Sequence, residues 1–292
     1  MVRRLAADGH AVTAAIRRGT APRLGDVTVR PFDLRDDASV REVAQGGCDV
    51  VVHLAAVASG ADARRDPGVA WEINAAGTAR LCEALAASAP VAPLLLLVST
   101  AEVYGAGDAP RARAESDPPA PCSPYAASKL GAEVAAAEAG RRTGLPVIVV
   151  RPFPHTGAGQ DTRFVIPAFA QRIHEAQRTG RRDVPVGNLD PVRDFLHVDD
   201  VVDAYLALIE RGTPGGCYNV ASGLGVSIRE IFERLRARLG ADVRAAVDPT
   251  MTRPADIPHL VGDATRLRDD TGWRPRRTLD DALDEIARAQ TR

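Results

Sequence analysis

The chain has 292 residues, of which 45% are hydrophobic and 26% are charged, and its formal net charge is -1 at pH 7. This is the composition of an ordinary globular protein, and the balanced charge gives no reason to expect a nucleic-acid-binding groove. No apolar run reaches the roughly 20 residues of a membrane span, and the amino terminus lacks the apolar segment of a signal peptide. The four cysteines are widely spaced, which predicts neither disulfides nor a metal site and fits a reducing cytoplasm.

The first segment, VRRLAADGHAVTAAIRRG, predicts the last turns of a helix, a glycine stop and a strand at Ala11–Ile16. In a dinucleotide-binding unit this helix and strand follow a first strand and a glycine-rich phosphate turn. Relative to such a unit we expect about 15 residues to be missing. A start codon assigned too far downstream and a form that lacks its pyrophosphate cradle are the two interpretations.

Short apolar runs then alternate with amphipathic, alanine-rich segments. This alternation predicts an α/β fold, a Rossmann-type doubly wound parallel sheet whose strands are joined by right-handed crossovers. The expected strands are Asp26–Phe32, Asp49–Ala55, Leu94–Thr100 and Pro146–Phe153, and the expected helices are Asp36–Gln45, Pro67–Ser88 and Pro124–Thr143.

After about Arg151 the segments become shorter and richer in proline, glycine and charge. Helices are expected at Asp199–Glu210 and Ser227–Leu239, with a turn at Thr213–Cys217. We therefore expect residues 1–151, with parts of 184–222, to form the sheet domain. Residues 152–292 should form mainly a smaller carboxy-terminal lobe.

The chain contains a single lysine among 37 basic residues, and this Lys129 follows Tyr125 by one helical turn. A nearby ammonium stabilises a phenolate, and lowering a tyrosine pKa by about 3 requires roughly 4 kcal/mol of interaction. Arginine differs from lysine in shape and hydration, so the two are not interchangeable. A surface tyrosine beside a solvated lysine is the structural alternative. The placement of the one lysine favours a catalytic pair.

Ser99 and Thr100 end the strand that precedes this helix. The carboxyl ends of strands in a doubly wound sheet border the ligand crevice. From there the Thr100 hydroxyl could polarise a substrate carbonyl while Tyr125 exchanges the proton. Simple capping of the strand end is the other interpretation.

An ordered set of motifs spans essentially the whole chain: DL (Asp33, Leu34), HLAA (His53–Ala56), NAAGT (Asn74–Thr78), STAEVYG (Ser99–Gly105), YAASK (Tyr125–Lys129), RPF (Arg151–Phe153), RDFLHVDDVV (Arg193–Val202) and YNVASG (Tyr218–Gly223). With these motifs the chain resembles the extended short-chain dehydrogenase/reductases that modify sugar nucleotides, the NAD-dependent epimerase/dehydratase family. The resemblance implies an oxidoreductase with an NADP-binding Rossmann domain and a sugar-nucleotide-binding lobe.

The resemblance also implies the residues that bind the cofactor. Asp33 and Leu34 would hold the adenine, and Leu54, Ala55 and Ala56 would line the cleft. Tyr125 would exchange the proton, with Lys129 on the nicotinamide ribose. Asn74, Ser99, Phe153 and His155 would complete the cofactor site. Arg17 stands where an NAD-preferring member would carry an acid, which implies NADP, with NAD as the alternative; an exposed arginine at a strand end is the structural interpretation.

The carboxy-terminal motifs HTGAGQDTRFVIPAFAQRI, VGNLDPVRDF, RPADIPHLVGD and TGWRP are most similar to family members that act on GDP-4-keto-6-deoxy sugars. The implied reaction is reduction of the 4-keto group by NADPH, which gives GDP-D-rhamnose. The implied substrate-binding residues are Thr100, Tyr125, Gln160, Asn188, Arg193, Arg253 and Asp256. The two arginines would clamp the diphosphate, whereas Asp256 could be a surface acid. Pro154 replaces the asparagine usual before HTG, which affects substrate positioning there.

Three other functions remain open. Glu102 matches the glutamate that removes the C5 proton in GDP-mannose 4,6-dehydratases, and an epimerase is also compatible with the family. A non-catalytic nucleotide-sensing protein would fit the missing phosphate loop.

Relatives usually dimerise through the helices expected at Pro67–Ser88 and Pro124–Thr143, so we expect a cytoplasmic homodimer without nucleic-acid or membrane partners. The same helix faces could instead only cover the sheet.

Overall fold

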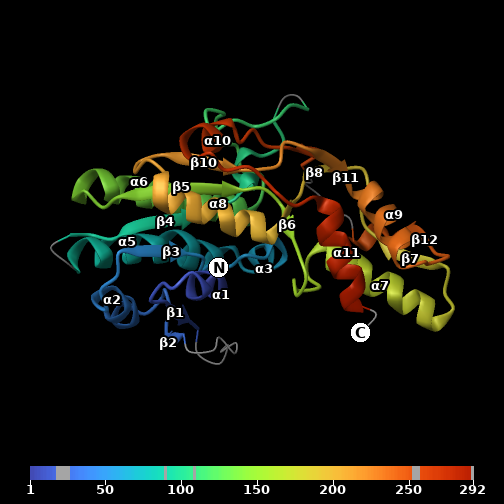
Figure 1. The fold of residues 1–292 in the computed structure, drawn as a ribbon, viewed down its shortest axis with the longest axis horizontal. Helices are drawn as coiled ribbons and strands as arrows, with labels where there is room; N and C mark the ends of the chain where they lie inside the picture. Colours follow the sequence, from blue (N-terminus) through green and yellow to red (C-terminus); the bar gives the residue numbers. More distant parts are fainter. Residues whose placement is uncertain (18–26, 89–90, 108–109, 252–256, 291–292) are drawn as a thin grey trace. The chain divides into compact units, whose positions relative to one another are not determined.

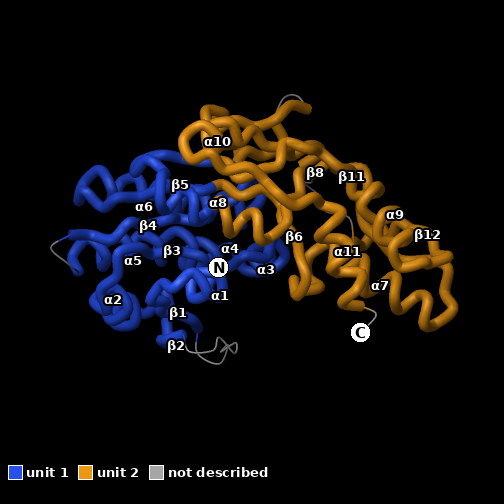
Figure 2. The backbone as a smooth tube through the Cα atoms, in the orientation of Figure 1, with its two compact units in different colours: residues 1–103, 123–150, 205–218 blue, residues 104–122, 151–204, 219–292 orange. Residues whose placement is uncertain are grey.

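The computed structural model describes residues 1–17, 27–88, 91–107, 110–251 and 257–290. The chain divides into two compact units, which Figure 2 shows in different colours. Unit 1 contains Met1–Val103, Ser123–Val150 and Tyr205–Tyr218. Unit 2 contains Tyr104–Cys122, Arg151–Ala204 and Asn219–Arg292. Each unit is thus assembled from separate stretches of the chain. The assignment of cofactor and substrate binding to two domains stays a prediction.

Unit 1 contains the expected parallel strands (Figure 1). After α1 (Val2–Ala7), β1 (Thr13–Ile16) pairs with β2 (Thr28–Pro31) in a two-stranded sheet. A second sheet has the order β10-β5-β4-β3, formed by β3 (Val50–His53), β4 (Leu94–Val98), β5 (Val147–Pro152) and β10 (Cys217–Val220). No described strand pairs with both β1 and β3, so the described sheet is in two parts rather than continuous. The carboxyl ends of β3 and β4 lie at the same edge because the two strands are parallel.

Both faces of the second sheet are covered, which explains why β4 is a run of leucines rather than an alternating strand. Leu95 and Leu97 pack into a core with α2 (Asp37–Gln45), α5 (Gly77–Ala87) and α6 (Pro124–Thr143). Leu96 points to the opposite face because side chains alternate along a strand. Ile148 on β5 is likewise fully buried, and it approaches Gly212 just beyond α8 (Val198–Arg211).

The stretch Pro67–Ser88, expected to be one helix, consists of three helical segments. It begins as α4 (Pro67–Trp71), continues as the π-helical turn η1 (Glu72–Ala76), and ends as α5. A short helix that was not expected, α3 (Gly60–Arg65), precedes it. The π turn lies against α6, where a Cβ on Gly131 would come within 2.7 Å of Trp71 and 3.0 Å of Ala75. Glycine at this position therefore permits the close approach of the two helices.

Helix α6 has the predicted bounds because both of its ends carry strong signals. The Ser123 side chain accepts a hydrogen bond from the Ala126 N–H, and Pro124 follows as the first helical residue. At the other end Gly144 has a φ of 79°, a left-handed conformation that glycine adopts without strain. Tyr125 and Lys129 are thus on a helix whose start is fixed by local capping signals.

Unit 2 is richer in regular elements than expected. Its core contains side chains of α7 (Val165–Thr179), α9 (Ile228–Arg238), α11 (Leu279–Gln290) and β7 (Asp183–Val186). Phe169 and Phe232 meet edge to face in that core, with ring centroids 5.4 Å apart. Helices α7 and α11 were not predicted from the sequence. This omission was wrong, because the apolar residues of both segments recur with a helical period between charged ones. The expected helices at Asp199–Glu210 and Ser227–Leu239 are present as α8 and α9.

Small sheets and turns complete unit 2. β6 (His155–Thr156) pairs with β9 (Leu196–His197), and β12 (Arg244–Val247) pairs with β7. A three-stranded sheet has the order β11-β8-β13, from Gly225–Ser227, Val192–Asp194 and His259–Leu260. Unit 2 also contains η3 (Pro249–Met251) and α10 (Thr265–Thr271), whereas η2 (Ala101–Tyr104) belongs to unit 1 except for Tyr104. No helix in the described part of the chain is both long and apolar enough to cross a bilayer.

Candidate active site

The carboxyl end of β4 and the first turns of α6 bring together the side chains that the sequence singled out in unit 1. Ser99 and Thr100 follow β4 directly and are buried, with exposed fractions of 3% and 8%. The Thr100 hydroxyl oxygen accepts a hydrogen bond from the Glu102 N–H at 3.2 Å. Thr100 also lowers the pKa of Tyr125, so its hydroxyl lies near the phenol. The strand-end hydroxyl and the helix phenol are therefore close to each other.

Lys129 lies one helical turn after Tyr125 and is almost completely buried, with 5% of its surface exposed. Its ammonium donates a hydrogen bond to the main-chain carbonyl of Val98, the last residue of β4. Tyr125 itself is only partly buried. The lysine is thus anchored on the strand, and part of the tyrosine, one helical turn earlier, reaches the surface of unit 1.

The pKa of Tyr125 is shifted opposite to the direction expected from the sequence. Burial raises it, the negative charge of Glu102 raises it further, and the hydrogen bond with Thr100 lowers it. Burial also lowers the pKa of Lys129 to about 8, an effect that the carboxylate of Glu133 opposes. Desolvation disfavours a charged group whatever its sign, and the expected stabilisation of the phenolate by Lys129 is not among the causes of this shift. Tyr125 is therefore protonated at neutral pH.

A network of buried hydrogen bonds that includes His53, Thr78 and Asn74 lies near Lys129. Thr78 donates its hydroxyl proton to the Asn74 carbonyl at 2.6 Å, so His53 Nε2, 3.1 Å away, donates to Thr78. Burial and the Lys129 charge lower the pKa of His53 to about 3, which keeps the imidazole neutral. The Asn74 side chain bonds the main chain of Val57 at 2.8 and 3.2 Å. Its amide also donates to Ser128, which in turn donates to the Tyr125 carbonyl.

Asn74 was expected to bind the cofactor, but its side-chain oxygen and nitrogen are hydrogen-bonded within the protein and only 1% of its surface is exposed. It connects the π turn, the loop after β3 and the start of α6. Its placement is that of a support for the loop rather than of a ligand at the surface. π-helical turns often occur at functional sites, and this one carries such a support.

The loops after β1, β2 and β3 hold the other expected cofactor residues of unit 1. Asp33 forms an exposed ion pair with Arg35 at 2.9 Å, and the charges of Arg35 and Arg17 help to lower the Asp33 pKa. Leu34 is 4% exposed and packs in the core, where a Cβ on Gly77 would lie 2.8 Å from it. Half of the Leu54 surface is exposed.

Ala55 and Ala56, which follow Leu54, are partly buried. Leu54 therefore presents an apolar side chain at the edge to which β3 and β4 lead, whereas Leu34 does not. The two arginines near Asp33 add positive charge at the ends of β1 and β2.

Unit 2 contains further residues that were predicted from the sequence to bind the cofactor or the sugar. Phe153 is 1% exposed, and a Cβ on Gly262 would lie 2.5 Å from its ring, so its side chain belongs to the core of the unit. His155 Nδ1 donates to the Phe153 carbonyl at 3.0 Å, and burial lowers the His155 pKa. Gln160 accepts from the Thr156 hydroxyl and donates to the His155 carbonyl. These bonds hold the HTGAGQ loop together.

The remaining expected substrate residues are also in unit 2 or outside the described residues. Asn188 is exposed and accepts a hydrogen bond from the Asp190 N–H at 3.0 Å. Arg193 on β8 is partly buried, and its guanidinium donates to the Val192 carbonyl at 2.9 Å. Arg253 and Asp256 lie outside the described residues. Pro154, which replaces an asparagine, accepts a hydrogen bond from the Leu196 N–H.

Two functional candidates were missed by reasoning from the sequence. Glu133 lies four residues after Lys129 on α6, is 7% exposed, and accepts a hydrogen bond from the Ser99 hydroxyl. Its helical spacing from the lone lysine was the available signal. Arg35, which holds Asp33, carried no signal because arginine is abundant throughout this chain.

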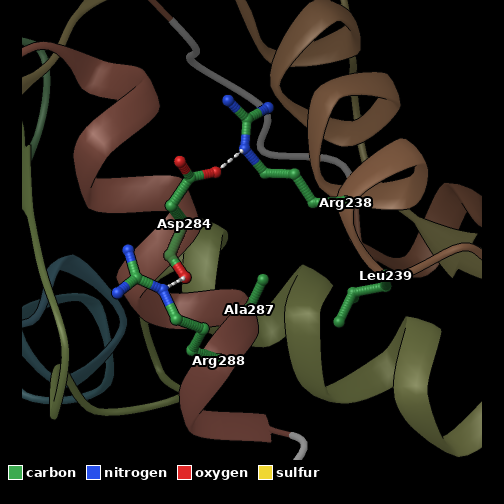
Figure 3. Close-up of a pocket in the computed structure, with 5 residues that line it drawn as sticks. All are labelled: Arg238, Leu239, Asp284, Ala287 and Arg288. Carbon is green, nitrogen blue, oxygen red and sulfur yellow. Dashed lines mark hydrogen bonds and ion pairs between the residues drawn. The ribbon is translucent and has the colours of Figure 1, made fainter.

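A shallow hollow in unit 2 lies between α9 and α11 (Figure 3). Its lining includes Arg238, which forms an ion pair with Asp284 at 2.5 Å, and Arg288, which donates to the Asp284 carbonyl at 3.1 Å. None of the residues singled out from the sequence lines this hollow. Both arginines thus bond to Asp284, one through its carboxylate and the other through its main-chain carbonyl, so the hollow is part of the packing of the two helices.

Comparisons with known proteins agree with this arrangement. Residues 1–221 match the NAD dependent epimerase/dehydratase family. The chain is 37% identical over 257 residues to the GDP-6-deoxy-D-mannose reductase of Pseudomonas aeruginosa, with 87% of this chain and 84% of that protein covered. It is also 30% identical over 245 residues to the GDP-6-deoxy-D-talose 4-dehydrogenase of Aggregatibacter actinomycetemcomitans, with 83% and 80% covered.

A solved structure supports the fold. The structure of RMD from Pseudomonas aeruginosa complexed with NADPH has a TM-score of 0.82 and 34% identity to this chain. The similarity covers 94% of this chain and 92% of that one. The expected Rossmann-type α/β architecture is confirmed by this similarity and by the parallel sheets.

Proposed function

The chain belongs to the NAD-dependent epimerase/dehydratase family, and from this premise we propose that it reduces the 4-keto group of a GDP-4-keto-6-deoxy sugar with NADPH to give GDP-D-rhamnose. The observation that carries the proposal is the cluster of Thr100, Tyr125 and Lys129 at the carboxyl end of β4. The reductase of Pseudomonas aeruginosa and the NADPH in its solved structure support the substrate class and the cofactor.

The protonation state of Tyr125 suits reduction. Addition of hydride to a carbonyl carbon produces an alkoxide, a much stronger base than a phenolate, so a protonated phenol can donate to it even when its pKa is raised. Burial and Glu102 raise the Tyr125 pKa and thereby keep the phenol protonated. Thr100 would hydrogen-bond the same substrate oxygen and orient it. Tyr125 then loses one proton per turnover, which solvent must return.

The side chains at this edge of unit 1 are chemically suited to bind a nicotinamide cofactor. Lys129 has three N–H donors, and the one used on Val98 leaves others to meet ribose hydroxyls. Leu54 offers an exposed apolar side chain at the same edge, and Arg17 and Arg35 supply positive charge near Asp33 that suits a 2'-phosphate. NADPH, when bound, supplies the hydride. The chain's own residues bind it, orient the ketone and provide the proton.

Substrate binding is proposed for the residues of unit 2 that the sequence selected. The partly buried Arg193 and the exposed Asn188 are polar side chains that could meet a diphosphate or a nucleoside. Arg253 and Asp256 belong to the same proposal from the sequence alone. Gln160 would act through the loop that it stabilises.

A direct assay tests the function. The protein is mixed with GDP-4-keto-6-deoxymannose and NADPH, and the loss of NADPH absorbance is followed with the Tyr125→Phe variant as the blank. Consumption of NADPH together with formation of GDP-D-rhamnose is the expected result. A wild-type protein that leaves both compounds unchanged would contradict the proposal and favour a nucleotide-sensing role.

The charge of Glu102 beside Tyr125 is the one observation that favours a second function. A carboxylate at this place could remove the C5 proton of GDP-mannose during a 4,6-dehydration. Incubation of the protein with GDP-mannose and NADP tests this function. Conversion of the sugar without net formation of NADPH would favour the dehydratase over the reductase.

We further propose that the protein acts in the cytoplasm as a homodimer that associates through α4, α5 and α6. Trp71 on α4 and Val134 on α6 expose 47% and 61% of their surfaces, which supports an apolar contact there. Val134→Glu should convert the dimer to a monomer in light scattering coupled to gel filtration. A wild-type protein that elutes as a monomer at all concentrations would contradict the dimer.

A further inference from the structure

Glu133 and Lys129 form a buried pair of ionisable residues one helical turn apart on α6. Their exposed fractions are 7% and 5%. A buried carboxylate is retained only where hydrogen bonds or an opposite charge compensate for its lost hydration. Glu133 has both: the Ser99 hydroxyl donates to Oε1, and its charge acts on Lys129. Nothing in the proton transfer from Tyr125 uses this carboxylate directly.

The groups that face Lys129 come from three elements. Val98, at the end of β4, accepts a hydrogen bond from Nζ. His53, at the end of β3, is neutral because its pKa is lowered to about 3. On α6 itself, Tyr125 lies one turn before Lys129 and is protonated at neutral pH, and Glu133 lies one turn after it and its charge raises the Lys129 pKa. Among the described residues, Glu133 is therefore the one whose charge stabilises the buried ammonium.

We propose that Glu133 is a positioning residue for the reduction, whose carboxylate, held by Ser99 one helical turn after Lys129, keeps the Lys129 ammonium charged at the carboxyl end of β4. The inference rests on the proposed function, because Lys129 matters there as the group that meets the cofactor ribose. Glu133 touches neither substrate nor cofactor and acts only through Lys129. Ser99 is then a link between the strand end and α6.

The role has a measurable electrostatic consequence. Burial already lowers the Lys129 pKa to about 8, so the ammonium loses its proton as the pH rises through that value. Without the carboxylate, burial is no longer opposed, and the pKa falls further. In Glu133→Gln the lysine should be partly neutral at physiological pH. As the pH is raised, both the affinity for NADPH and kcat should then begin to fall at a lower pH than in the wild type.

The single lysine of the chain makes the measurement direct. Protein labelled with lysine carrying 13C at Cε gives one lysine resonance, and its titration reports the Lys129 pKa without cofactor or substrate. Glu133→Gln, which keeps the shape of the side chain, should lower that pKa by about 1 or more, as expected for loss of an adjacent opposite charge. Glu138→Gln is the matched control on the same helix, because Glu138 is exposed and pairs with Arg142.

Two further readouts separate this role from a general loss of structure. The alkaline limb of kcat/KM for the keto sugar should move to lower pH in Glu133→Gln by the same amount as the Lys129 pKa. The affinity for NADPH, followed by fluorescence titration, should weaken along with it. Glu133→Asp keeps the negative charge and should restore much of the NADPH affinity and of the wild-type alkaline limb of kcat/KM. This variant also serves if Glu133→Gln does not fold.

An unchanged Lys129 pKa in Glu133→Gln would overturn the inference, as would full activity across the alkaline range. A wild-type protein that reduces no keto sugar would overturn the proposed function instead. The lysine titration would still decide the role of Glu133 in that case, since it requires no turnover. The two failures are therefore distinguishable.

Discussion

The hydroxyl of Thr100, just beyond β4, lies near the phenol of Tyr125 in the first turn of α6 and lowers its pKa. This contact joins a strand end to a helix start that lie far apart in the chain, and it is the point at which a substrate carbonyl would meet both a hydrogen-bond donor and an acid. The Ser123 cap sets where the helix begins and therefore which residue faces Thr100. The geometry of proton transfer thus depends on a local capping signal.

Tyr125→Phe removes the proton donor and leaves the ring. We expect kcat to fall by roughly 10²-fold or more, the usual contribution of a positioned acid, while the affinity for NADPH stays near the wild-type value. Stopped-flow reduction and a fluorescence titration of NADPH measure the two quantities separately. Tyr218→Phe is the comparison, because Tyr218 is buried elsewhere in unit 1 and its hydroxyl accepts a hydrogen bond from the Thr213 N–H. Turnover by Tyr125→Phe at the wild-type rate would show that another group supplies the proton.

Lys129→Arg keeps the positive charge and changes its shape. The lysine is 5% exposed and directs its ammonium at the Val98 carbonyl, so a larger planar guanidinium cannot occupy the same place. We expect weaker NADPH binding together with a lower kcat. Kinetics over a range of NADPH concentrations would separate the two effects.

The reverse exchange on the same helix, Arg142→Lys, is the control. Arg142 is exposed and pairs with Glu138, so it should behave like the wild type. If both variants retained normal kinetics, positive charge alone would suffice at position 129.

Glu102→Gln distinguishes the two reactions that the site could catalyse. A reductase needs the Tyr125 proton and no base at C5, so the variant should retain far more keto-sugar reduction than Tyr125→Phe. Glu102 also raises the Tyr125 pKa, and its removal should therefore lower that pKa. NMR of the GDP-keto sugar in deuterated water measures the exchange of the C5 proton for deuterium. A sample without enzyme is the blank. Enzyme-catalysed exchange that is lost in Glu102→Gln would support the dehydratase.

Much of the site could be predicted from the sequence because its signals are local. The cap at Ser123, the spacing of Tyr125 and Lys129, and the strand that ends at Thr100 are all read over a few residues. Glu133 was missed because its importance depends on burial, and an acid on an alanine-rich helix predicts a solvated face as readily as an interior one. The direction of the Tyr125 pKa shift was wrong for the same reason, since desolvation depends on the surrounding side chains.

The fold shows the same division between local and tertiary information. The bounds of α6 were predicted because a serine cap and a glycine stop mark them. The π turn at Glu72–Ala76 was not, because it arises where the helix packs against α6 rather than from its own sequence. Asn74 was assigned to the cofactor from a motif, whereas only the structure reveals that its amide holds the loop at Val57.

Gly131→Ala tests whether this packing supports the site. The added methyl would lie 2.7 Å from the Trp71 ring and 3.0 Å from Ala75, so the Trp71 ring or α6 must shift. We expect a destabilisation of about 1 to 3 kcal/mol, as for other overpacked contacts, although alanine is the better helix former. Urea unfolding measures this loss, and a raised KM for NADPH should accompany it because the start of α6 carries Tyr125 and Lys129. Gly60→Ala is the control, since a Cβ there would approach only the flexible end of Arg64, at 3.5 Å. Equal stability of the two variants would mean that α6 and the π turn adjust without cost, and Asn74 would then be the more important link between them.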